Sequence, residues 1–517
     1  MESRPGLALV AVRNRGLLTV CVMLANLMQT IDSTIANVAL PYMQGSLSAT
    51  SDQITWVLTS YVIAAAIMTA PVGWLAARFG RRRLHLICLI GFTAASMLCG
   101  AAQSLEQIVF FRLLQGVFGA ALVPLAQATM LDIYPFERRA EAMAVFGMGV
   151  MVGPIIGPTL GGFLTDAYSW RWVFYVNLPF GLLATAGLAV LLPRNAPDTA
   201  LRFDWTGFAV LAMGIGAFQL MLDRGQEQDW FTAREIVVEA VLAGLGCYLF
   251  VVHMLTARTP FIPPAIFRDR NFTAAMLMMF FVGMVLLASS ALLAPYLQTL
   301  GNYPVYTTGL AMAPRGAGTM CAILIAGRIG TRIDQRKLVA FGLVLLSATM
   351  YRMSLWTPDV PPDQLLITVL LQGFSMGLIF NPMQVLAFTT LEPRLRGSAT
   401  ALLSLFRNLG AAIGVSVTSF TLARLAQVSH ADLAALATPF NRSLQAHGAV
   451  TRYLSPLDHA GAIAHHGAAL LDQTINREAL IIAYSGDYRM MTFVALPPLL
   501  LLLLMRRHRR PAPAAGE

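Results

Sequence analysis

Apolar runs of bilayer length recur along the whole of this 517-residue chain, and they constrain its fold more than any other feature. A helix that crosses the hydrocarbon core uses roughly 20 mostly apolar residues, so fourteen such runs predict fourteen transmembrane helices. Only 12% of the residues are charged, against about 25% in soluble domains, which excludes a soluble class. The expected spans are 17–40, 54–76, 85–104, 107–131, 142–165, 173–192, 206–222, 234–255, 273–299, 308–327, 338–356, 364–391, 400–424 and 481–504.

The placement of Lys and Arg predicts how these spans are oriented. If both termini are cytoplasmic, 24 of the 36 basic residues fall in cytoplasmic segments and seven on the opposite side. This bias follows the positive-inside rule. The net charge of +10 is therefore a topology signal, and we expect no nucleic-acid partner. We expect a multi-pass protein of the bacterial cytoplasmic (inner) membrane, with a retained first span.

The chain also repeats itself. The run RLLQG at Arg112 aligns with VLLQG at Val369, an offset of 257. The glycine and basic loop that starts at Gly73 aligns with the one that starts at Gly327, an offset of 254. Near-constant offsets indicate two related halves.

The repeat predicts the domain organisation. Residues 1–195 and 261–517 are expected to form two six-helix bundles, and 196–260 an inserted pair of spans. The hydrophilic segment 426–480 is expected to be an outer loop with no fold of its own. Overall we expect an all-α polytopic membrane protein.

Asp32 lies inside the first expected span. A carboxylate within a membrane helix is costly, so it should face a cavity or a partner, and its burial favours proton uptake. The alternative is a helix-capping acid at a broken first span. Arg112 in the fourth span is its natural electrostatic counterpart, and because the repeat has Val369 there, the fold does not require this charge. A structural arginine that binds backbone carbonyls is the alternative.

Further polar residues within the spans are second-rank candidates for lining a cavity. Glu239 belongs to the inserted pair, with Glu235 one turn before it. Two arginines of the second half would line the cavity or bind carbonyls. The second-rank residues are Gln29, Asn37, Glu239, Arg315 and Arg407.

The sequence offers little for metal or enzyme chemistry. All five cysteines lie in apolar runs and none in CxxC spacing, so we expect no extracytoplasmic disulfide and no redox or zinc-ribbon site. Five histidines in 426–480 lack tight ligand spacing, so no metal site is expected. They are His430, His447, His459, His465 and His466. With no catalytic triad or phosphate loop, a membrane-embedded enzyme is a disfavoured alternative.

The loop GWLAARFGRRR that begins at Gly73 resembles the loop between the second and third spans of the major facilitator superfamily. Gly73, Arg78, Gly80 and Arg81 carry this resemblance, which implies a gating loop at the cytoplasmic face. Its glycines allow a tight turn and a close approach of helices. Ala77 stands where the superfamily usually has an acid, so the charge pairing of that acid is not expected here.

The fifth span contains GPIIGPTLGG, which is similar to the motif of antiporter members of that superfamily. Gly153, Gly157 and Gly161 are four apart and so lie close to one helix face, where they permit close packing. Pro154 and Pro158 disrupt the helix ladder locally. Ordinary small-residue packing is the alternative interpretation.

The first-span sequence LMQTIDSTIANVALP resembles that of fourteen-span drug:proton antiporters of the EmrB/QacA type, as do residues 170–179 and 222–225. The resemblance implies the major facilitator fold, with two six-helix bundles plus two inserted helices. It also implies efflux of varied, often amphipathic compounds in exchange for protons, with Asp32 and Arg112 as the proton-coupling residues. No cofactor is implied beyond the proton motive force.

We therefore expect a proton-coupled multidrug efflux transporter. A dedicated exporter of one metabolite, peptide or siderophore is the main alternative; an importer and a non-transporting sensor are less favoured. The expected partners are the lipid bilayer, amphipathic small molecules and protons. In a cell with two membranes the resemblance also implies a periplasmic membrane-fusion adaptor and an outer-membrane channel, for which 426–480 offers a docking surface.

Overall fold

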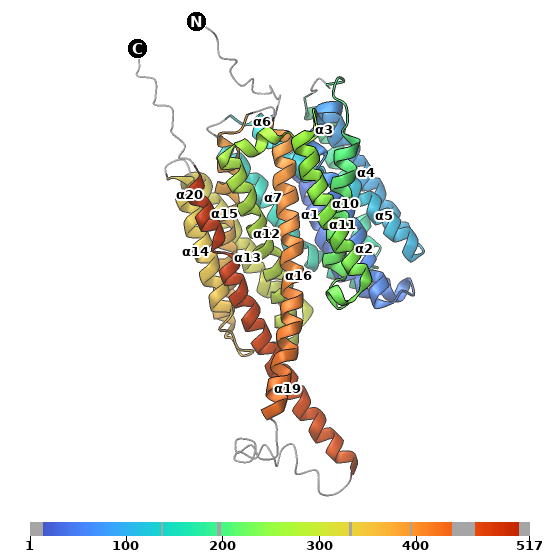
Figure 1. Ribbon diagram of the computed structural model, residues 1–517, viewed down its shortest axis with the longest axis vertical. Coiled ribbons are helices and arrows are strands. Elements are labelled where there is room, and N and C mark those ends of the chain that lie inside the picture. Colours follow the sequence, from blue (N-terminus) through green and yellow to red (C-terminus); the bar gives the residue numbers. More distant parts are fainter. Residues whose placement is uncertain are drawn as a thin grey trace.

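The computed structural model is a bundle of long helices that run side by side (Figure 1). It describes residues 14–135, 138–193, 198–329, 333–392, 395–436 and 461–505. The first part contains α1 (Arg15–Ser46), α2 (Ser51–Thr69), α3 (Val72–Phe79), α4 (Arg81–Ala101), α5 (Leu105–Gly119), α6 (Leu122–Ile133), α7 (Arg139–Ala167), α8 (Trp172–Tyr175) and α9 (Asn177–Leu191). Then follow α10 (Trp205–Arg224), η2 (Trp230–Thr232), α11 (Arg234–Thr256) and η3 (Pro264–Arg268). The last part contains α12 (Arg270–Pro295), η4 (Tyr296–Leu300), α13 (Val305–Ile329), α14 (Gln335–Met353), α15 (Pro362–Thr389), α16 (Arg396–Leu436), α19 (Gly461–Val494) and α20 (Pro497–Leu504).

Each predicted span coincides with one helix or with consecutive helices, and the described residues contain no strand. Eleven described helices are long and apolar enough to cross a membrane, or twelve if α2 and α3, bent by 60°, count as one span. The two remaining predicted spans, 142–165 and 338–356, correspond to α7 and α14. Basic residues at both ends of α14 lower its hydropathy. The all-α polytopic architecture is thus confirmed.

Helix starts follow local capping chemistry. The Asn14 side chain accepts from the Leu17 N–H and starts α1, and Ser104 caps α5 in the same way. Thr50 and Gln53 form a reciprocal capping box at α2. Figure 1 places α3, α6 and α20 at one end of the bundle. We call this end, where α1 begins, the N-terminal side, and the opposite end the far side.

Helices of the two sequence halves meet along several contacts. α7 packs along α13, and α16 contacts α2, α3 and α6. In the interior, Gln127 Nε2 donates to Gln384 Oε1 at 2.6 Å, and both side chains are buried. These glutamines are 257 positions apart, which equals one of the offsets of the internal repeat. The boundaries at 195 and 260 stay predictions.

The inserted helices α10 and α11 pack tightly on each other. A Cβ on Gly246 would lie 2.5 Å from the Gly214 Cα, so only glycine permits this approach. α10 also contacts α2 and α16, and Ser416 Oγ of α16 donates to the Leu222 carbonyl at 3.1 Å. The inserted pair therefore contacts both halves.

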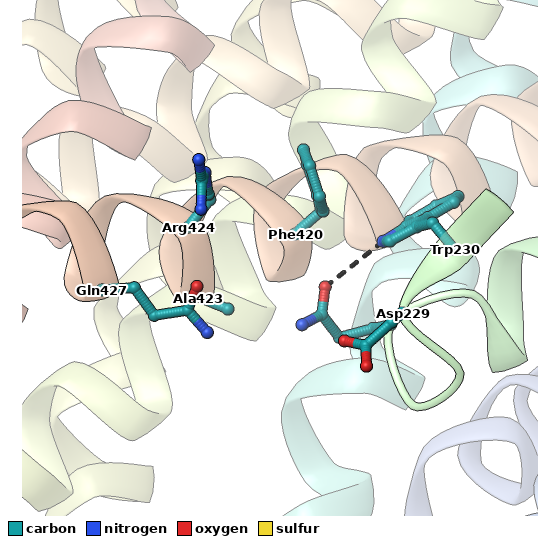
Figure 2. A pocket seen from close by; sticks show the side chains of 7 residues that line it. Asp229, Trp230, Phe420, Ala423, Arg424 and Gln427 are labelled. Atoms are coloured by element: carbon teal, nitrogen blue, oxygen red, sulfur yellow. Dashed lines mark hydrogen bonds between the residues drawn. The ribbon is translucent and has the colours of Figure 1, made fainter. Parts of the chain in front are cut away.

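On the far side, a cavity of about 280 Å³ lies between α16 and the loop that follows α10 (Figure 2). The Trp230 ring packs edge-on against Phe420, with ring centres 5.5 Å apart. The residues that line the cavity are Gln226, Asp229, Trp230, Phe420, Ala423, Arg424 and Gln427. None of them is a residue that the sequence predicts for a site, so the cavity marks the contact of the inserted pair with α16.

The predicted loop 426–480 is wrong at both ends. α16 continues to Leu436 and α19 already begins at Gly461, because the Ala-, Leu- and Gln-rich sequence favours helix. The 41 residues of α16 span about 60 Å, twice the roughly 30 Å hydrocarbon core. We call residues 425–436 and 461–478 the helical extension, which projects from the bundle in Figure 1. Within it, His430 Nε2 lies 3.0 Å from Asp472 Oδ1; residues 437–460, with His447 and His459, lie outside the described residues.

The glycines of the fifth-span motif let α7 approach α1. A Cβ on Gly153 would lie 2.5 Å from the Thr30 Cβ and 2.7 Å from the Thr30 carbonyl carbon. A Cβ on Gly157 would lie 2.1 Å from the Thr34 Oγ1, and one on Gly161 would lie 3.0 Å from the Ile35 carbonyl oxygen. The motif thus packs against the segment of α1 that carries Asp32.

We predict that Gly153→Ala destabilises the protein by about 1–3 kcal/mol, because the added methyl overpacks a backbone contact. Thermal unfolding of the purified protein in detergent measures this. The control is Gly244→Ala in α11, where a Cβ meets no atom within 4 Å. It should leave the unfolding temperature unchanged or slightly raised, since alanine favours helix. Equal effects of the two substitutions would contradict the packing role.

Candidate functional site

Asp32 and Arg112 form an ion pair in the interior of the N-terminal helices α1–α9. The Arg112 Nη1 lies 2.8 Å from the Asp32 Oδ2, and the side chains are 1% and 0% exposed. Asp32 lies in the middle of α1, and Arg112 about two turns into α5. The structure therefore brings together the two residues that the sequence predicts as a pair.

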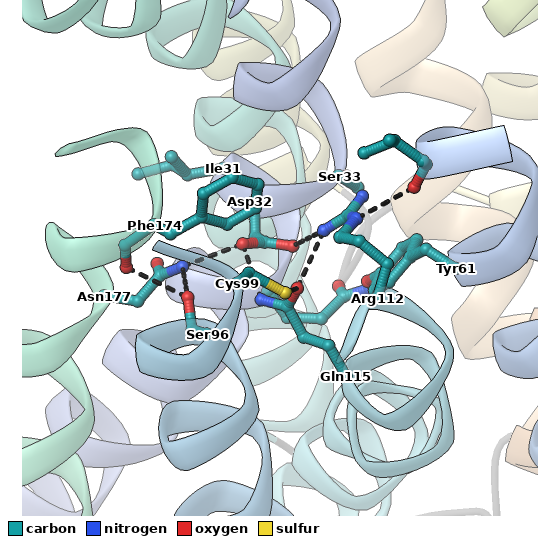
Figure 3. Close-up of polar contacts among 12 residues, drawn as sticks. Ile31, Asp32, Ser33, Tyr61, Ser96, Cys99, Arg112, Gln115, Phe174 and Asn177 are labelled. Carbon is teal, nitrogen blue, oxygen red and sulfur yellow. Dashed lines mark hydrogen bonds and ion pairs between the residues drawn. The ribbon is translucent and has the colours of Figure 1, made fainter. Parts of the chain in front are cut away.

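Two amides complete the hydrogen bonding of the carboxylate (Figure 3). Gln115 Nε2 and Asn177 Nδ2 each donate to Asp32 Oδ1 at 2.8 Å. Gln115 lies one turn after Arg112 on the same face of α5 and accepts from Arg112 Nη1 at 2.9 Å. Asn177 opens α9 and also donates to Ser96 Oγ of α4 at 2.9 Å. Helices α1, α4, α5 and α9 are thereby tied together at one carboxyl group.

Arg112 is held on its other side by α2. Its Nε donates to the Val57 carbonyl at 3.1 Å, and its guanidinium carbon lies 4.3 Å from the centre of the Tyr61 ring. The Tyr61 hydroxyl accepts from Gln29 Nε2 at 3.0 Å. Gln29, a second-rank candidate, therefore lies in the next layer of the same polar cluster, one turn before Asp32 on α1.

This arrangement suits reversible proton binding. Burying a charge costs several kcal/mol unless it is paired and hydrogen-bonded, and here both charges are. A proton on Asp32 would neutralise the carboxylate and leave Arg112 without its counter-ion. Binding or losing one proton therefore changes the interactions among four helices, which is a way to link protonation to helix movement.

The other second-rank residues do not reach Asp32. Asn37 is exposed further along α1. Glu239 pairs with Arg224 at 3.5 Å, and Arg224 also pairs with Glu235 at 2.8 Å, so these acids tie α11 to the end of α10. A role for Glu239 in a central cavity stays a prediction without support from its contacts.

Arg315 and Arg407 lie in the second half. Arg315 is buried and donates to Ser289 Oγ at 3.0 Å, to Ser290 Oγ at 2.5 Å and to the Leu286 carbonyl at 3.0 Å. Arg407 contacts Asn408 Oδ1 at 3.3 Å. Among the described residues neither arginine has a carboxylate partner, so the second half has no counterpart of the Asp32–Arg112 ion pair at these arginines.

Comparison with known families identifies the scaffold. The family model described as Major Facilitator Superfamily matches residues 22–423. The chain belongs to the major facilitator superfamily. The multidrug export protein EmrB of Escherichia coli (strain K12) is 35% identical over 469 residues, which cover 90% of each chain. The fatty acid resistance protein FarB of Neisseria gonorrhoeae is 32% identical over 488 residues, 94% of this chain and 95% of that one.

Solved structures confirm the major facilitator fold. The human organic anion transporter MFSD10 superposes with a TM-score of 0.59 at 15% identity, over 94% of this chain and 99% of that one. The proton:xylose symporter XylE superposes with a TM-score of 0.60 at 15% identity, over 94% of this chain and 95% of that one. At such identity these likenesses show the fold alone.

The superfamily loop closes the N-terminal side of the bundle. Gly80 has φ 83°, a conformation that favours glycine, and forms the turn between α3 and α4. A Cβ on Gly73 would lie 2.5 Å from the Ser398 Cα, so α3 touches the start of α16 there. Arg78 Nη1 donates to the Asp198 carbonyl at 3.5 Å. The loop thus joins the two halves on this side.

Asp132 is an acid that pairs with an arginine of this loop, in which Ala77 carries no charge. This acid, next to the end of α6, forms ion pairs with Arg81 of the loop and, at 3.4 Å, with Arg396 of α16. It therefore bridges the two halves through two arginines. A gating role for the loop stays a prediction.

Several of these residues escape the sequence reasoning, although signals for them exist. Gln115 follows Arg112 by three positions and so shares its helix face, and Asn177 lies in a segment that resembles the antiporter family. Asp132 directly follows the span 107–131. Asp487 lies within the predicted span 481–504, where the cost of a buried acid should have singled it out. Within the described residues no group of three or more His, Cys, Asp or Glu could hold a metal ion.

We predict that Arg112→Met destabilises the protein by about 3–5 kcal/mol, because it leaves Asp32 buried without its counter-ion. The loss should be smaller at lower pH, because a proton on Asp32 removes the unpaired charge. Thermal unfolding at mildly acidic and mildly alkaline pH measures this. The double variant Asp32→Asn/Arg112→Met is the control, because no titratable group remains in the pair. A pH-independent loss in Arg112→Met would contradict the ion-pair account.

Proposed function

We propose that this protein is a proton-coupled exporter of varied amphipathic compounds. The observation that carries the proposal is the buried Asp32–Arg112 pair, held by Gln115 and Asn177 within a major facilitator fold. The relatives support it, since the protein 35% identical over 90% of the chain is named a multidrug export protein. The proposal needs no cofactor: the proton motive force drives the exchange.

In the proposed cycle, Asp32 releases its proton to the cytoplasm when the transporter opens inward and loads substrate. When it opens outward, an external proton binds Asp32 and the substrate leaves. Proton and substrate occupancy exclude each other, which couples the two fluxes. Each positive charge that moves inward gains about 2.3 kcal/mol per 100 mV of membrane potential, enough for uphill export.

A second candidate is dedicated export of one kind of anionic amphiphile. Arg315 supports it, because this buried guanidinium contacts only neutral oxygens among the described residues. The relative named fatty acid resistance protein points the same way. A panel that contains cationic, neutral and fatty-acid compounds separates the two candidates in one assay.

The membrane and the partners are part of the proposal. We place the protein in the bacterial inner membrane with the N-terminal side in the cytoplasm, in line with the excess of basic residues on that side. The helical extension would then project into the periplasm. In a two-membrane cell it would bind a membrane-fusion adaptor that leads to an outer-membrane channel, because it extends beyond the roughly 30 Å hydrocarbon core.

We predict that Asp32→Asn abolishes substrate-dependent proton flux and uphill export in proteoliposomes, while the protein still inserts. The amide keeps the volume and hydrogen bonds of the side chain but does not titrate. Cationic and neutral amphiphiles are tested with a pH-sensitive dye in the lumen. Asp359→Asn, at an exposed acid on the far side, should behave as the wild type. Retained uphill export in Asp32→Asn at normal expression would remove Asp32 from the mechanism.

We predict that Asp432→Cys in the helical extension is labelled by a membrane-impermeant maleimide in cells with a permeable outer membrane and an intact inner membrane. The orientation proposed above places this exposed position outside the cytoplasm. The native Cys247 and Cys321 are exposed and are first replaced by serine. Labelling only after the inner membrane is permeabilised would invert the proposed topology.

A further inference from the structure

Asp487 of α19 is a second fully buried acid within a membrane-spanning helix, and the cycle above does not use it. Its side chain is 0% exposed, like that of Asp32. The two acids differ in their partners. Asp32 has one arginine and two amides, whereas neither oxygen of Asp487 has a hydrogen-bond partner in the part of the chain that the structure describes.

Aromatic side chains with unpartnered polar atoms lie beside Asp487. Tyr484 and Tyr488 flank it on the same face of α19 and are buried. Tyr296 of η4 packs against both, with ring centres 5.4 Å and 6.5 Å away, and Trp356 lies 6.0 Å from Tyr296. The Tyr296 and Tyr488 hydroxyls and the Trp356 Nε1 are buried without a hydrogen-bond partner among the described residues. Each buried polar group without a partner destabilises the folded protein by about 1–3 kcal/mol. A cluster of such groups therefore indicates a functional role.

No positive charge offsets a carboxylate at this position. α19 packs against α12, α14, α16 and η4. Away from the helix starts and the helical extension, the charged groups of these elements are Arg352, which contacts Gln364, Arg407, which contacts Asn408, and Arg424. Arg489 on α19 itself is exposed, and Arg315 of α13 acts electrostatically on Tyr488. None forms an ion pair with Asp487 among the described residues.

An unpaired carboxylate in such a place would cost several kcal/mol. This environment therefore favours the protonated, neutral form of Asp487. Its depth in the bundle is given by Ser485, two residues before it, whose Oγ donates at 2.6 Å to the carbonyl of the buried Ser354, the residue that follows α14. Asp487 thus lies nearer to the far side of the bundle than to the N-terminal side.

We propose that Asp487 binds a second proton of the transport cycle. The carboxyl group takes this proton from the far side. It releases the proton, and becomes a carboxylate, when a rearrangement of α19 opens it toward the N-terminal side. This inference rests on the proposed proton-coupled export and extends it: two protons enter for each substrate molecule that leaves, one on Asp32 and one on Asp487.

The proton-to-substrate ratio in proteoliposomes tests the inference. The probe is whichever cationic or neutral amphiphile of the panel gives the largest proton flux. At a fixed pH gradient without membrane potential, the substrate gradient that stops net flux reports the ratio. In Asp487→Asn the ratio should fall by one proton, so the highest substrate gradient falls about tenfold per unit of pH gradient. Asp359→Asn should keep the wild-type substrate gradient. Asp487→Glu keeps a titratable carboxyl group, so its substrate gradient should fall less than that of Asp487→Asn.

An infrared measurement on the purified protein tests the protonation itself, without transport. The wild type should show a carboxylic-acid carbonyl band that Asp487→Asn lacks, and the detergent elution profile of the variant shows that it is folded. An unchanged substrate gradient in Asp487→Asn, or a wild type without this band, overturns the inference. If instead the wild type moves no protons with any compound, the proposed function itself fails, and the two failures are thereby distinguished.

Discussion

The buried Asp32–Arg112 pair is the interaction on which the rest of the structure depends. Two charges in a low-dielectric interior persist only when each is paired and hydrogen-bonded. Here the partners come from α1, α2, α5 and α9, so four helices must hold their positions for the pair to be stable. The same requirement makes the pair sensitive to protonation, because one proton on Asp32 neutralises the carboxylate and leaves the charge of Arg112 unpaired.

Close backbone packing holds this pair in place and joins the halves around it. Gly153 and Gly157 bring α7 against the residues of α1 on either side of Asp32. On the N-terminal side, Asp132 bridges Arg81 and Arg396 across the halves. Protonation of Asp32 can therefore affect the contacts between the halves through α1 and α7, which are neighbours along much of their length. The glycine packing of α7 on α1 and the ion pairs of Asp132 thus connect the site with the rest of the fold.

Much of this fold could be predicted from the sequence, because bilayer-length apolar runs and small-residue spacing are local patterns. The pair itself was predictable as well, since acids and arginines are rare inside spans and Asp32 and Arg112 stand out. The amides were harder: Gln115 and Asn177 carry no charge, and only the packing of α5 and α9 shows that both point at one carboxylate. Asp132 is missed because an acid at a span end is ordinary, and its two arginines are distant in sequence. The helical extension is missed because the hydrophilic character of the segment predicts a loop, whereas its Ala- and Leu-rich composition favours helix.

Proton release on substrate binding tests the central claim most directly. The purified protein is mixed with a transported amphiphile in weakly buffered detergent solution, and the pH change is calibrated against the amount bound. The wild type should release protons as the compound binds, and Asp32→Asn should release about one proton fewer for each molecule bound. Equal release by the two proteins would contradict the exchange of substrate and proton at Asp32.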